Sequence, residues 1–186
     1  MAENLVQFLS TIGKLKKTER AGWVLKGIKH PESVSDHMYR MAIMAMTCLD
    51  STSEIKMDHC IKLCLVHDMA ECIVGDITPS DNITKEEKQR LEKDAMDHLG
   101  SLLPKETSSS VKELFEEYEA QETREAMFVK DLDRFEMILQ AFEYETERDD
   151  PGFLQEFFDS VEGKIRSPSI RKLAESLIKT RQKKEM

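Results

Sequence analysis

The apolar residues of this chain follow the spacing of helices, and alternating strand patterns are almost absent. Side chains three and four positions apart form an apolar stripe over residues 3–16 and a second one over 128–142. Residues 58–74 are largely apolar and lead into Gly75. We therefore expect an all-α protein, a helical bundle of about seven or eight helices.

Capping residues predict where most of these helices begin. The candidate starts are Ser33 with Asp36, Asp58, Thr84 with Glu87, Ser110 with Glu113, Asp150-Pro151 and Ser167-Pro168. The predicted helices then run over 33–49, 58–74, 84–102 and 110–148, followed by two more. Residues 18–33 are predicted to be less regular, the charged stretch 84–94 to be a solvated helix face, and the basic tail from Lys179 to be frayed.

Size and charge narrow the class of protein. The 186 residues suit a single domain, 1–186, with 40% hydrophobic and 34% charged residues. No apolar run reaches the roughly 20 residues of a membrane helix, and the N-terminus lacks the features of a secretory signal. The net charge of −9 argues against a nucleic-acid polymer as partner. It still permits a small phosphorylated substrate, because a bound metal would supply positive charge locally.

The cysteine pattern favours thiols over a disulfide framework or a zinc cluster. Cys48, Cys60, Cys64 and Cys72 all fall in apolar helical patterns, and none form a Cys-x-x-Cys pair. Buried thiols in a cytoplasmic protein are the expected arrangement.

Polar residues within the apolar run 58–74 are the first sign of chemistry. His67, Asp68 and Glu71 lie in a segment that is otherwise suited to the core. Burying such groups without partners costs several kcal/mol, of order 2–7 for a neutral group and more for a charge. His37 and Asp133 border two other apolar helix faces. A bound cation would stabilise all of these side chains.

The mixed set of nitrogen and oxygen ligands restricts the metal. Two imidazoles and two carboxylates suit Mn, Co, Fe or Zn, with open positions for water and substrate. If the central helix is continuous, Glu71 follows His67 by four positions and Asp68 by three, which places all three on one side. Glu71 would then face a metal-bound water. Each of the two histidines taken singly is more often a core residue than a ligand.

Five sequence blocks, in order, carry a resemblance to a known family. They are Trp23, Pro31-Glu32-Ser33-Val34-Ser35-Asp36-His37, His67-Asp68-Met69-Ala70-Glu71, Gly75-Asp76-Ile77 and Lys130-Asp131-Leu132-Asp133. This pattern resembles the HD-domain superfamily of metal-dependent phosphohydrolases, and specifically its 5′-deoxynucleotidase branch. The resemblance covers roughly residues 14–145, with 146–186 as C-terminal helices.

The resemblance implies hydrolysis of deoxyribonucleoside 5′-monophosphates to deoxynucleoside and phosphate by a metal-activated water. It implies that the divalent metal, which could be Mn, Co, Mg or Zn, binds four side chains: His37, His67, Asp68 and Asp133. Glu71 would activate or orient the water, and Asp76 would lie by the substrate and assist proton transfer. Trp23 would pack near the sugar and help reject a 2′-hydroxyl. Asp76 as a simple turn cap and Trp23 as plain core are the alternatives.

Other features of the site are open at this stage. Bacterial relatives place an arginine directly before the tryptophan, where this chain has Gly22, so Arg20 is the candidate contact for the phosphate. This leaves the strictness of deoxyribose selection open. Glu71, Asp76 and the carbonyl of Ile77 form a possible second site for a hard cation such as Mg²⁺. Asp131 is interpreted as a partner of Arg134.

Two alternative functions remain beside the 5′-deoxynucleotidase. One is an HD-type phosphohydrolase acting on another nucleotide, and the other is a non-catalytic module that binds a nucleotide or metal and regulates a partner. The resemblance also implies a homodimer, for which residues 128–145 and the last two helices could furnish the interface.

Overall fold

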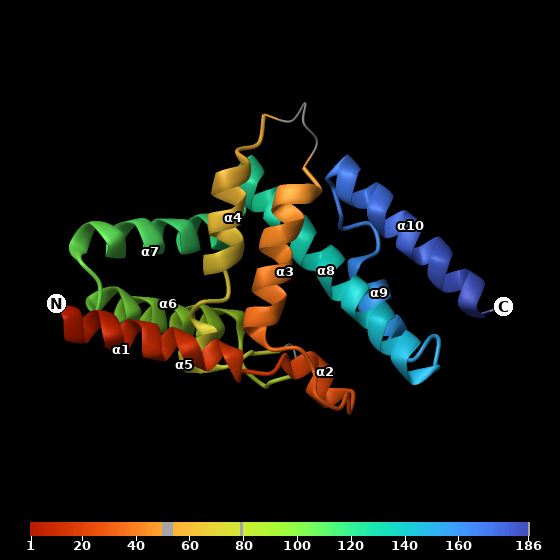
Figure 1. The fold of residues 1–186 in the computed structure, drawn as a ribbon, viewed down its shortest axis with the longest axis horizontal. Coiled ribbons are helices and arrows are strands. Elements are labelled where there is room, and N and C mark those ends of the chain that lie inside the picture. The colour runs from red at the N-terminus through yellow and green to blue at the C-terminus, as the bar shows by residue number, and fades with distance from the viewer. Residues whose placement is uncertain (50–53, 79, 186) are drawn as a thin grey trace. The chain divides into compact units, whose positions relative to one another are not determined.

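The computed structural model describes residues 1–49, 54–78 and 80–185, and throughout these residues the protein is all-α, as predicted. Eight of the helices in the described part have seven or more residues (Figure 1). The elements are α1 (Ala2–Ile12), the 3₁₀ helix η1 (Gly13–Lys16), α2 (Ala21–Leu25), α3 (Val34–Thr47), α4 (Met57–Val66), α5 (Glu71–Val74), α6 (Lys85–Ser101), α7 (Lys105–Ala120), α8 (Arg124–Arg148), α9 (Gln155–Val161) and α10 (Pro168–Glu185).

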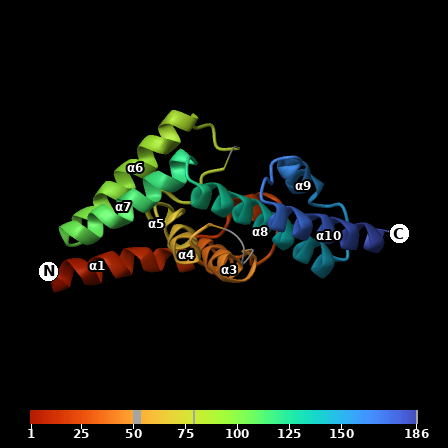
Figure 2. The same ribbon diagram turned by 90° about the horizontal axis from the view of Figure 1, so that it is seen from above.

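The chain forms two compact units. The first comprises residues 1–39 and 62–120 and contains α1, η1, α2, α5, α6, α7 and the adjoining ends of α3 and α4. Helices α6 and α7 lie side by side, joined by a short loop (Figure 2). The core of this unit is made of apolar side chains from most of its elements: Leu15, Val34, Met38, Val66, Ala70, Cys72, Ala95, Met96, Leu99 and Phe115.

The second unit comprises residues 40–61 and 121–186. Helix α8 is its centre, and both α9 and α10 pack against it. Leu132 and Ile138 on α8, Leu154 before α9 and Ile170 on α10 are completely buried. The apolar stripe predicted over 128–142 is therefore a core face, as expected from its spacing.

The segment predicted to be irregular, 18–33, is paired with the start of α3. Glu19 forms an antiparallel bridge with Ser33. The amide of Arg20 donates to the carbonyl of Glu32 at 3.1 Å. Ser33 and Asp36 then form the predicted capping box, in which the Asp36 carboxylate accepts from the Ser33 amide and the Ser33 hydroxyl accepts from the Asp36 amide. These bonds fix the position of the short helix α2.

Several predicted helix boundaries are wrong. The central helix is not continuous over 58–74: α4 begins at Met57, so that Asp58 lies in its first turn, and ends at Val66. Helix α7 begins at Lys105 and not at Ser110, because Pro104 ends the preceding loop and its carbonyl accepts from the amide of Ser108. Helix α9 begins at Gln155, after a turn, and not at Asp150-Pro151.

The region 110–148 is also interrupted. Gln121 has a φ of 54°, in the left-handed region, which ends α7. Thr123 then caps α8 by accepting from the amide of Ala126. The caps predicted at Thr84 and at Ser167-Pro168 are confirmed, since α6 begins at Lys85 and α10 at Pro168.

The basic tail is helical to Glu185, so its predicted fraying from Lys179 is wrong. Arg181 is only 6% exposed, and its Nε and Nη2 donate to the two carboxylate oxygens of Glu145 at 2.6 and 2.9 Å. The same carboxylate accepts from the backbone amide of Leu154. A bidentate, buried pair of this kind holds the last turns of α10 against α8.

The described residues contain no helix with the length and apolar character needed to cross a membrane. Cys60, Cys64 and Cys72 are buried and Cys48 is half-buried, and no disulfide joins cysteines in the described part of the chain. The predicted buried thiols are therefore confirmed for three of the four.

Replacing Glu145 with alanine should destabilise the protein by about 3–5 kcal/mol, because the buried guanidinium of Arg181 would lose its counter-charge. The measurement is thermal or urea unfolding followed by circular dichroism. The matched control is Glu147→Ala, an exposed carboxylate on the same helix. Equal stability of the two variants would contradict a role for this ion pair in holding α10.

Candidate metal centre

The site residues of the first unit lie at a break between two helices. After α4 the chain makes a turn over 67–70, in which the amide of Met69 donates to Val66 and the amide of Glu71 donates to Asp68. These bonds span three residues, as in a 3₁₀ helix, and not four. The prediction that Glu71 shares one α-helical face with His67 and Asp68 is therefore wrong in its geometry.

The ring of His67 is held in one tautomer. Its side chain is buried, and Nδ1 lies 3.0 Å from the carbonyl oxygen of Cys64. A carbonyl oxygen only accepts, so Nδ1 carries the hydrogen. In the neutral ring this leaves the lone pair on Nε2, the form in which a histidine binds a metal.

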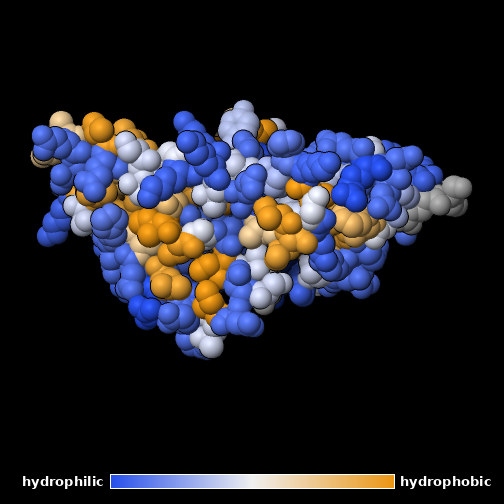
Figure 3. Space-filling view, turned by 90° about the horizontal axis from the view of Figure 1, so that it is seen from below, coloured by the Kyte–Doolittle hydropathy of each residue, from blue (hydrophilic) through white to orange (hydrophobic). Residues whose placement is uncertain are grey.

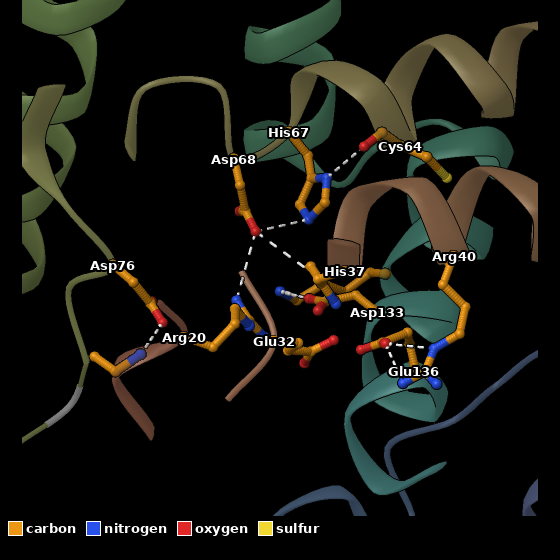
Figure 4. Close-up of polar contacts among 12 residues, drawn as sticks. Arg20, Glu32, His37, Arg40, Cys64, His67, Asp68, Asp76, Asp133 and Glu136 are labelled. Carbon is orange, nitrogen blue, oxygen red and sulfur yellow. Dashed lines mark hydrogen bonds and ion pairs between the residues drawn. The ribbon is translucent and has the colours of Figure 1, made fainter. Parts of the chain in front are cut away.

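His37 and Asp68 lie around this nitrogen. The His37 and His67 rings meet edge to face with centroids 5.5 Å apart, and each ring offers a nitrogen within 4.8 Å of the other. Oδ2 of Asp68 lies 3.0 Å from Nε2 of His67 and 3.8 Å from Nε2 of His37 (Figure 4). Three of the four predicted metal ligands therefore converge within the first unit.

The Asp68 carboxylate is stabilised in its charged form. Burial by itself raises the pKa of Asp68, but the imidazole of His67, the guanidinium of Arg20 and the imidazole of His37 together lower it well below its usual range. Asp68 is therefore ionised at neutral pH, as a metal ligand must be.

Glu71 has the opposite electrostatic environment. Its side chain is buried, and Oε2 makes no hydrogen bond to any residue the structure describes. Burial and the nearby charges of Asp68 and Asp76 raise the pKa of Glu71 to about 10. A buried carboxyl with a strongly raised pKa beside a charged partner is typical of a functional site.

The predicted substrate residues are placed as follows. Nη1 of Arg20 lies 3.6 Å from Oδ2 of Asp68 (Figure 4), and the Arg20 side chain is 16% exposed. Oδ2 of Asp76 accepts from the backbone amide of Ala21 at 2.7 Å and so caps α2. Trp23 is 2% exposed, and its Nε1 donates to Glu32 at 2.9 Å. Arg20 is thus directly beside a predicted metal ligand, whereas Trp23 is held as a core residue.

Asp133 and Asp131 belong to the second unit. Asp133 is half-buried on α8 and forms an ion pair with Lys130 at 2.7 Å. Asp131 pairs with Arg134 at 3.0 Å, as interpreted from the sequence, and also accepts from the amides of Arg166 and Ser167 ahead of α10. The assignment of Asp133 as the fourth metal ligand stays a prediction.

Several residues beside the site were missed in the sequence. The ring of Tyr118 lies 4.8 Å from that of His67, and no local pattern around Tyr118 signals this contact. Lys88 donates to the carbonyl of Ile77, one of the oxygens predicted for a second cation. Glu92 is 8% exposed, so the stretch 84–94 is not a fully solvated face. The spacing of Lys88 and Glu92, four residues apart, is the only signal that links them.

The residues present fit a divalent metal. Nε2 of His67 is buried without a hydrogen bond among the described residues, and the ionised carboxylate of Asp68 lies beside it. Leaving such an atom buried costs free energy unless a ligand contacts it. A set of imidazole nitrogen and carboxylate oxygen suits a first-row divalent metal.

The sequence is similar to a known family and to several named proteins. The model of the HD domain family matches residues 12–173. The 5′-deoxynucleotidase HDDC2 of Xenopus laevis is 54% identical over 179 residues, which cover 96% of this chain and 88% of that protein. The human protein of the same name is 54% identical over 176 residues, which cover 95% of this chain and 85% of the human protein. The 5′-deoxynucleotidase YGK1 of Saccharomyces cerevisiae is 40% identical, covering 94% and 82%.

Solved structures show the same fold. A predicted metal-dependent phosphohydrolase from Magnetospirillum magnetotacticum superposes with a TM-score of 0.77 and 25% identity, covering 99% of this chain and 96% of that one. A conserved hypothetical protein from Pyrococcus furiosus superposes with a TM-score of 0.75 and 33% identity, covering 94% and 99%.

The raised pKa of Glu71 predicts a pH-dependent stability for metal-stripped protein. The pKa of Glu71 is near 10 in the folded protein and 4.5 in the unfolded chain. Its contribution to the free energy of unfolding is therefore complete below pH 4.5 and is lost as the pH rises toward 10. Glu71→Gln cannot ionise. Between pH 5.5 and 8.5 the free energy of unfolding of Glu71→Gln should therefore increase relative to that of wild type, by up to about 1.4 kcal/mol per pH unit. The difference between the two melting temperatures should widen accordingly.

Differential scanning fluorimetry in a chelator measures this difference, with the exposed Glu86→Gln on α6 as the control. Parallel pH profiles of wild type and Glu71→Gln would show that Glu71 is not desolvated in the folded protein.

Proposed function

Because the chain belongs to the HD domain family, we propose that it is a metal-dependent 5′-deoxynucleotidase that hydrolyses deoxyribonucleoside 5′-monophosphates to deoxynucleoside and phosphate. Relatives that are 48–54% identical over more than 90% of this chain are named 5′-deoxynucleotidase. The observation that carries the proposal is that Asp68, with a side chain 17% exposed, meets the buried rings of His37 and His67, with the buried carboxyl of Glu71 beside them. This is machinery for activating water against a phosphate ester.

Four residues are proposed to hold the metal. His37, His67 and Asp68 already converge, and Asp133 on α8 is the proposed fourth ligand, in exchange for its ion pair with Lys130. Mn, Co, Mg and Zn are the candidate ions; the imidazole ligands favour the transition metals and Zn over Mg.

The bound metal would lower the pKa of water and polarise a phosphoryl oxygen. Around it, the residues of this chain divide the remaining tasks. The positive charge of a bound metal would lower the raised pKa of Glu71, and the ionised Glu71 is proposed to take the proton of the attacking water, since its buried Oε2 has no hydrogen bond from the described residues. Arg20, beside Asp68, is proposed to bind the phosphate. Attack is direct, because no serine or cysteine of the chain lies in a nucleophile motif.

Asp76 and Trp23 are proposed to act at the nucleoside end of the substrate. Asp76 would approach the leaving 5′-oxygen with the carboxylate oxygen that does not cap α2. Trp23 would restrict the space beside the sugar through a ring fixed by its bond to Glu32. Its exposed fraction of 2% means that very little of the Trp23 side chain is accessible to a substrate in this conformation.

A second site for a hard cation at Glu71, Asp76 and the carbonyl of Ile77 is also proposed, as a weaker site. Two of these oxygens already have partners, since Asp76 accepts from the Ala21 amide and Ile77 accepts from Lys88. A second cation must compete with both bonds, which supports binding at millimolar and not micromolar Mg²⁺.

We propose further that residues 1–186 act as one HD domain in the cytoplasm and form a homodimer. Apolar side chains remain on the surface, seen as orange patches in Figure 3. On α10, Leu173 and Ile178 are each 38% exposed. Beside them in the second unit is a cleft of about 700 Å³ whose lining includes Phe158 and Ile165. These features support the last two helices as the interface.

Phosphate release from a panel of deoxy- and ribonucleoside 5′-monophosphates tests the activity. Metal-stripped protein should be inactive, and addition of Mn²⁺ or Co²⁺ should restore turnover of several deoxynucleotides. Ribonucleotides should react at least about tenfold more slowly in kcat/KM if about 1.4 kcal/mol of discrimination comes from excluding the 2′-hydroxyl. Absence of release with every metal and nucleotide would refute the proposed activity.

Substituting Glu71 separates an enzyme from a binding module. Loss of a general base typically lowers kcat by about 10²–10⁴-fold, and we expect this for Glu71→Gln with the nucleotide Kd changed by less than about threefold. Single-turnover kinetics measures the rate of the chemical step, and calorimetry measures the Kd for the nucleotide. A full rate in Glu71→Gln would assign proton transfer to another residue, and Glu86→Gln is again the control.

A further inference from the structure

Lys88, in the first turns of α6, is directed at the loop that follows α5. Its Nζ donates to the carbonyl oxygen of Ile77 at 3.2 Å and lies 3.5 Å from Oε1 of Glu92. The side chain is 38% exposed, so the ammonium group is accessible to solvent as well. Ile77 directly follows Asp76, which places this cation at the edge of the candidate site.

Lys88 differs from Arg90 and Lys93, two cations further along α6. Arg90 pairs with Glu87 at 2.7 Å and Asp94 at 3.0 Å, and Lys93 pairs with Asp97 at 2.8 Å, all on the exposed face of the helix. These charges are closely matched by carboxylates.

The nearer partner of Lys88 is a neutral carbonyl instead. Its carboxylate partner, Glu92, is buried, and that burial raises the pKa of Glu92 and weakens it as a counter-ion. The charge of Lys88 is therefore less fully compensated than the charges of its neighbours.

The charge balance of the site requires cations in addition to the metal. Asp68, Glu71 and Asp76 supply three carboxyl groups, and a nucleoside monophosphate brings a further −1.5 to −2 charges, roughly, at neutral pH. Arg20 lies next to Asp68. Arg20 directly precedes α2 and Lys88 lies on α6, so the two cations come from two different elements.

We propose that Lys88 is a phosphate-binding residue of this site, which exchanges the Ile77 carbonyl for a non-bridging oxygen of the substrate phosphate. The exchange is favourable because a hydrogen bond between an ammonium and a phosphate is stronger than one to a neutral carbonyl. The four-carbon stem of lysine allows the movement without a change in the backbone. The inference rests on the proposed function for its substrate, and its direct ligand is the phosphate group.

The test uses Mn²⁺-loaded protein and measures binding of inorganic phosphate and of deoxynucleoside separately by calorimetry. Lys88→Met should weaken phosphate binding by about 10- to 100-fold, since a charge-assisted hydrogen bond is lost. It should leave deoxynucleoside binding within about twofold, and KM for the monophosphate should rise with the phosphate Kd. Lys88→Arg should recover most of the phosphate affinity. Lys93→Met, on the same helix but paired with Asp97, should match wild type.

The outcomes separate this inference from the proposed function. If Lys88→Met lowers kcat while phosphate binding stays unchanged, Lys88 only supports the loop at Ile77 and the proposal is wrong. Wild-type protein that binds no phosphate also refutes it. Lys88-dependent phosphate binding in a protein that turns over no nucleotide would sustain the role of Lys88 and refute the nucleotidase. If Lys88→Met is poorly folded by circular dichroism, Lys88→Gln provides the same comparison.

Discussion

The hydrogen bond from Nδ1 of His67 to the carbonyl of Cys64 is the contact on which the candidate site depends. The last four carbonyls of a helix have no partner within the helix, and Cys64 is among those of α4. The imidazole satisfies this carbonyl at the place where the helix ends. The same bond fixes the tautomer that presents Nε2 toward Asp68. One hydrogen bond thus both satisfies a carbonyl at the end of α4 and orients the ring of His67.

Three buried carboxylates among the described residues show two kinds of environment. Glu145 is paired with Arg181 and a backbone amide, and Asp131 accepts from Arg134 and two amides ahead of α10. Their hydrogen bonds explain their burial in full. Oε2 of Glu71 has no such bond from the described residues, and its burial is unfavourable for the charged form. The hydrogen bonds of Glu145 and Asp131 stabilise the fold, whereas the carboxyl of Glu71 is suited to chemistry.

The sequence allowed the fold class, half of the six predicted caps and the convergence of His37, His67 and Asp68 to be predicted. Apolar periodicity reports which faces are buried, and capping residues act locally, so both are readable from the chain. The break after Val66 was missed because residues 67–70 contain neither glycine nor proline to signal the end of a helix.

Long-range contacts could not be predicted in the same way. The helical tail depends on a pairing between Arg181 and Glu145, 36 residues apart, and the position of Lys88 depends on the carbonyl of Ile77. Asp133 was assigned from its motif and from its position beside an apolar helix face, and its role stays a prediction. Tertiary pairing of this kind leaves no periodic signal in the sequence.

The bond between Asp76 and the amide of Ala21 has a consequence for motion. It ties the loop after α5 to α2, while the pairing of Glu19 with Ser33 ties α2 to the start of α3. Three segments distant in sequence therefore share one small set of backbone bonds. Local opening of any one of them releases the other two, so their amides should exchange with solvent as one cooperative unit.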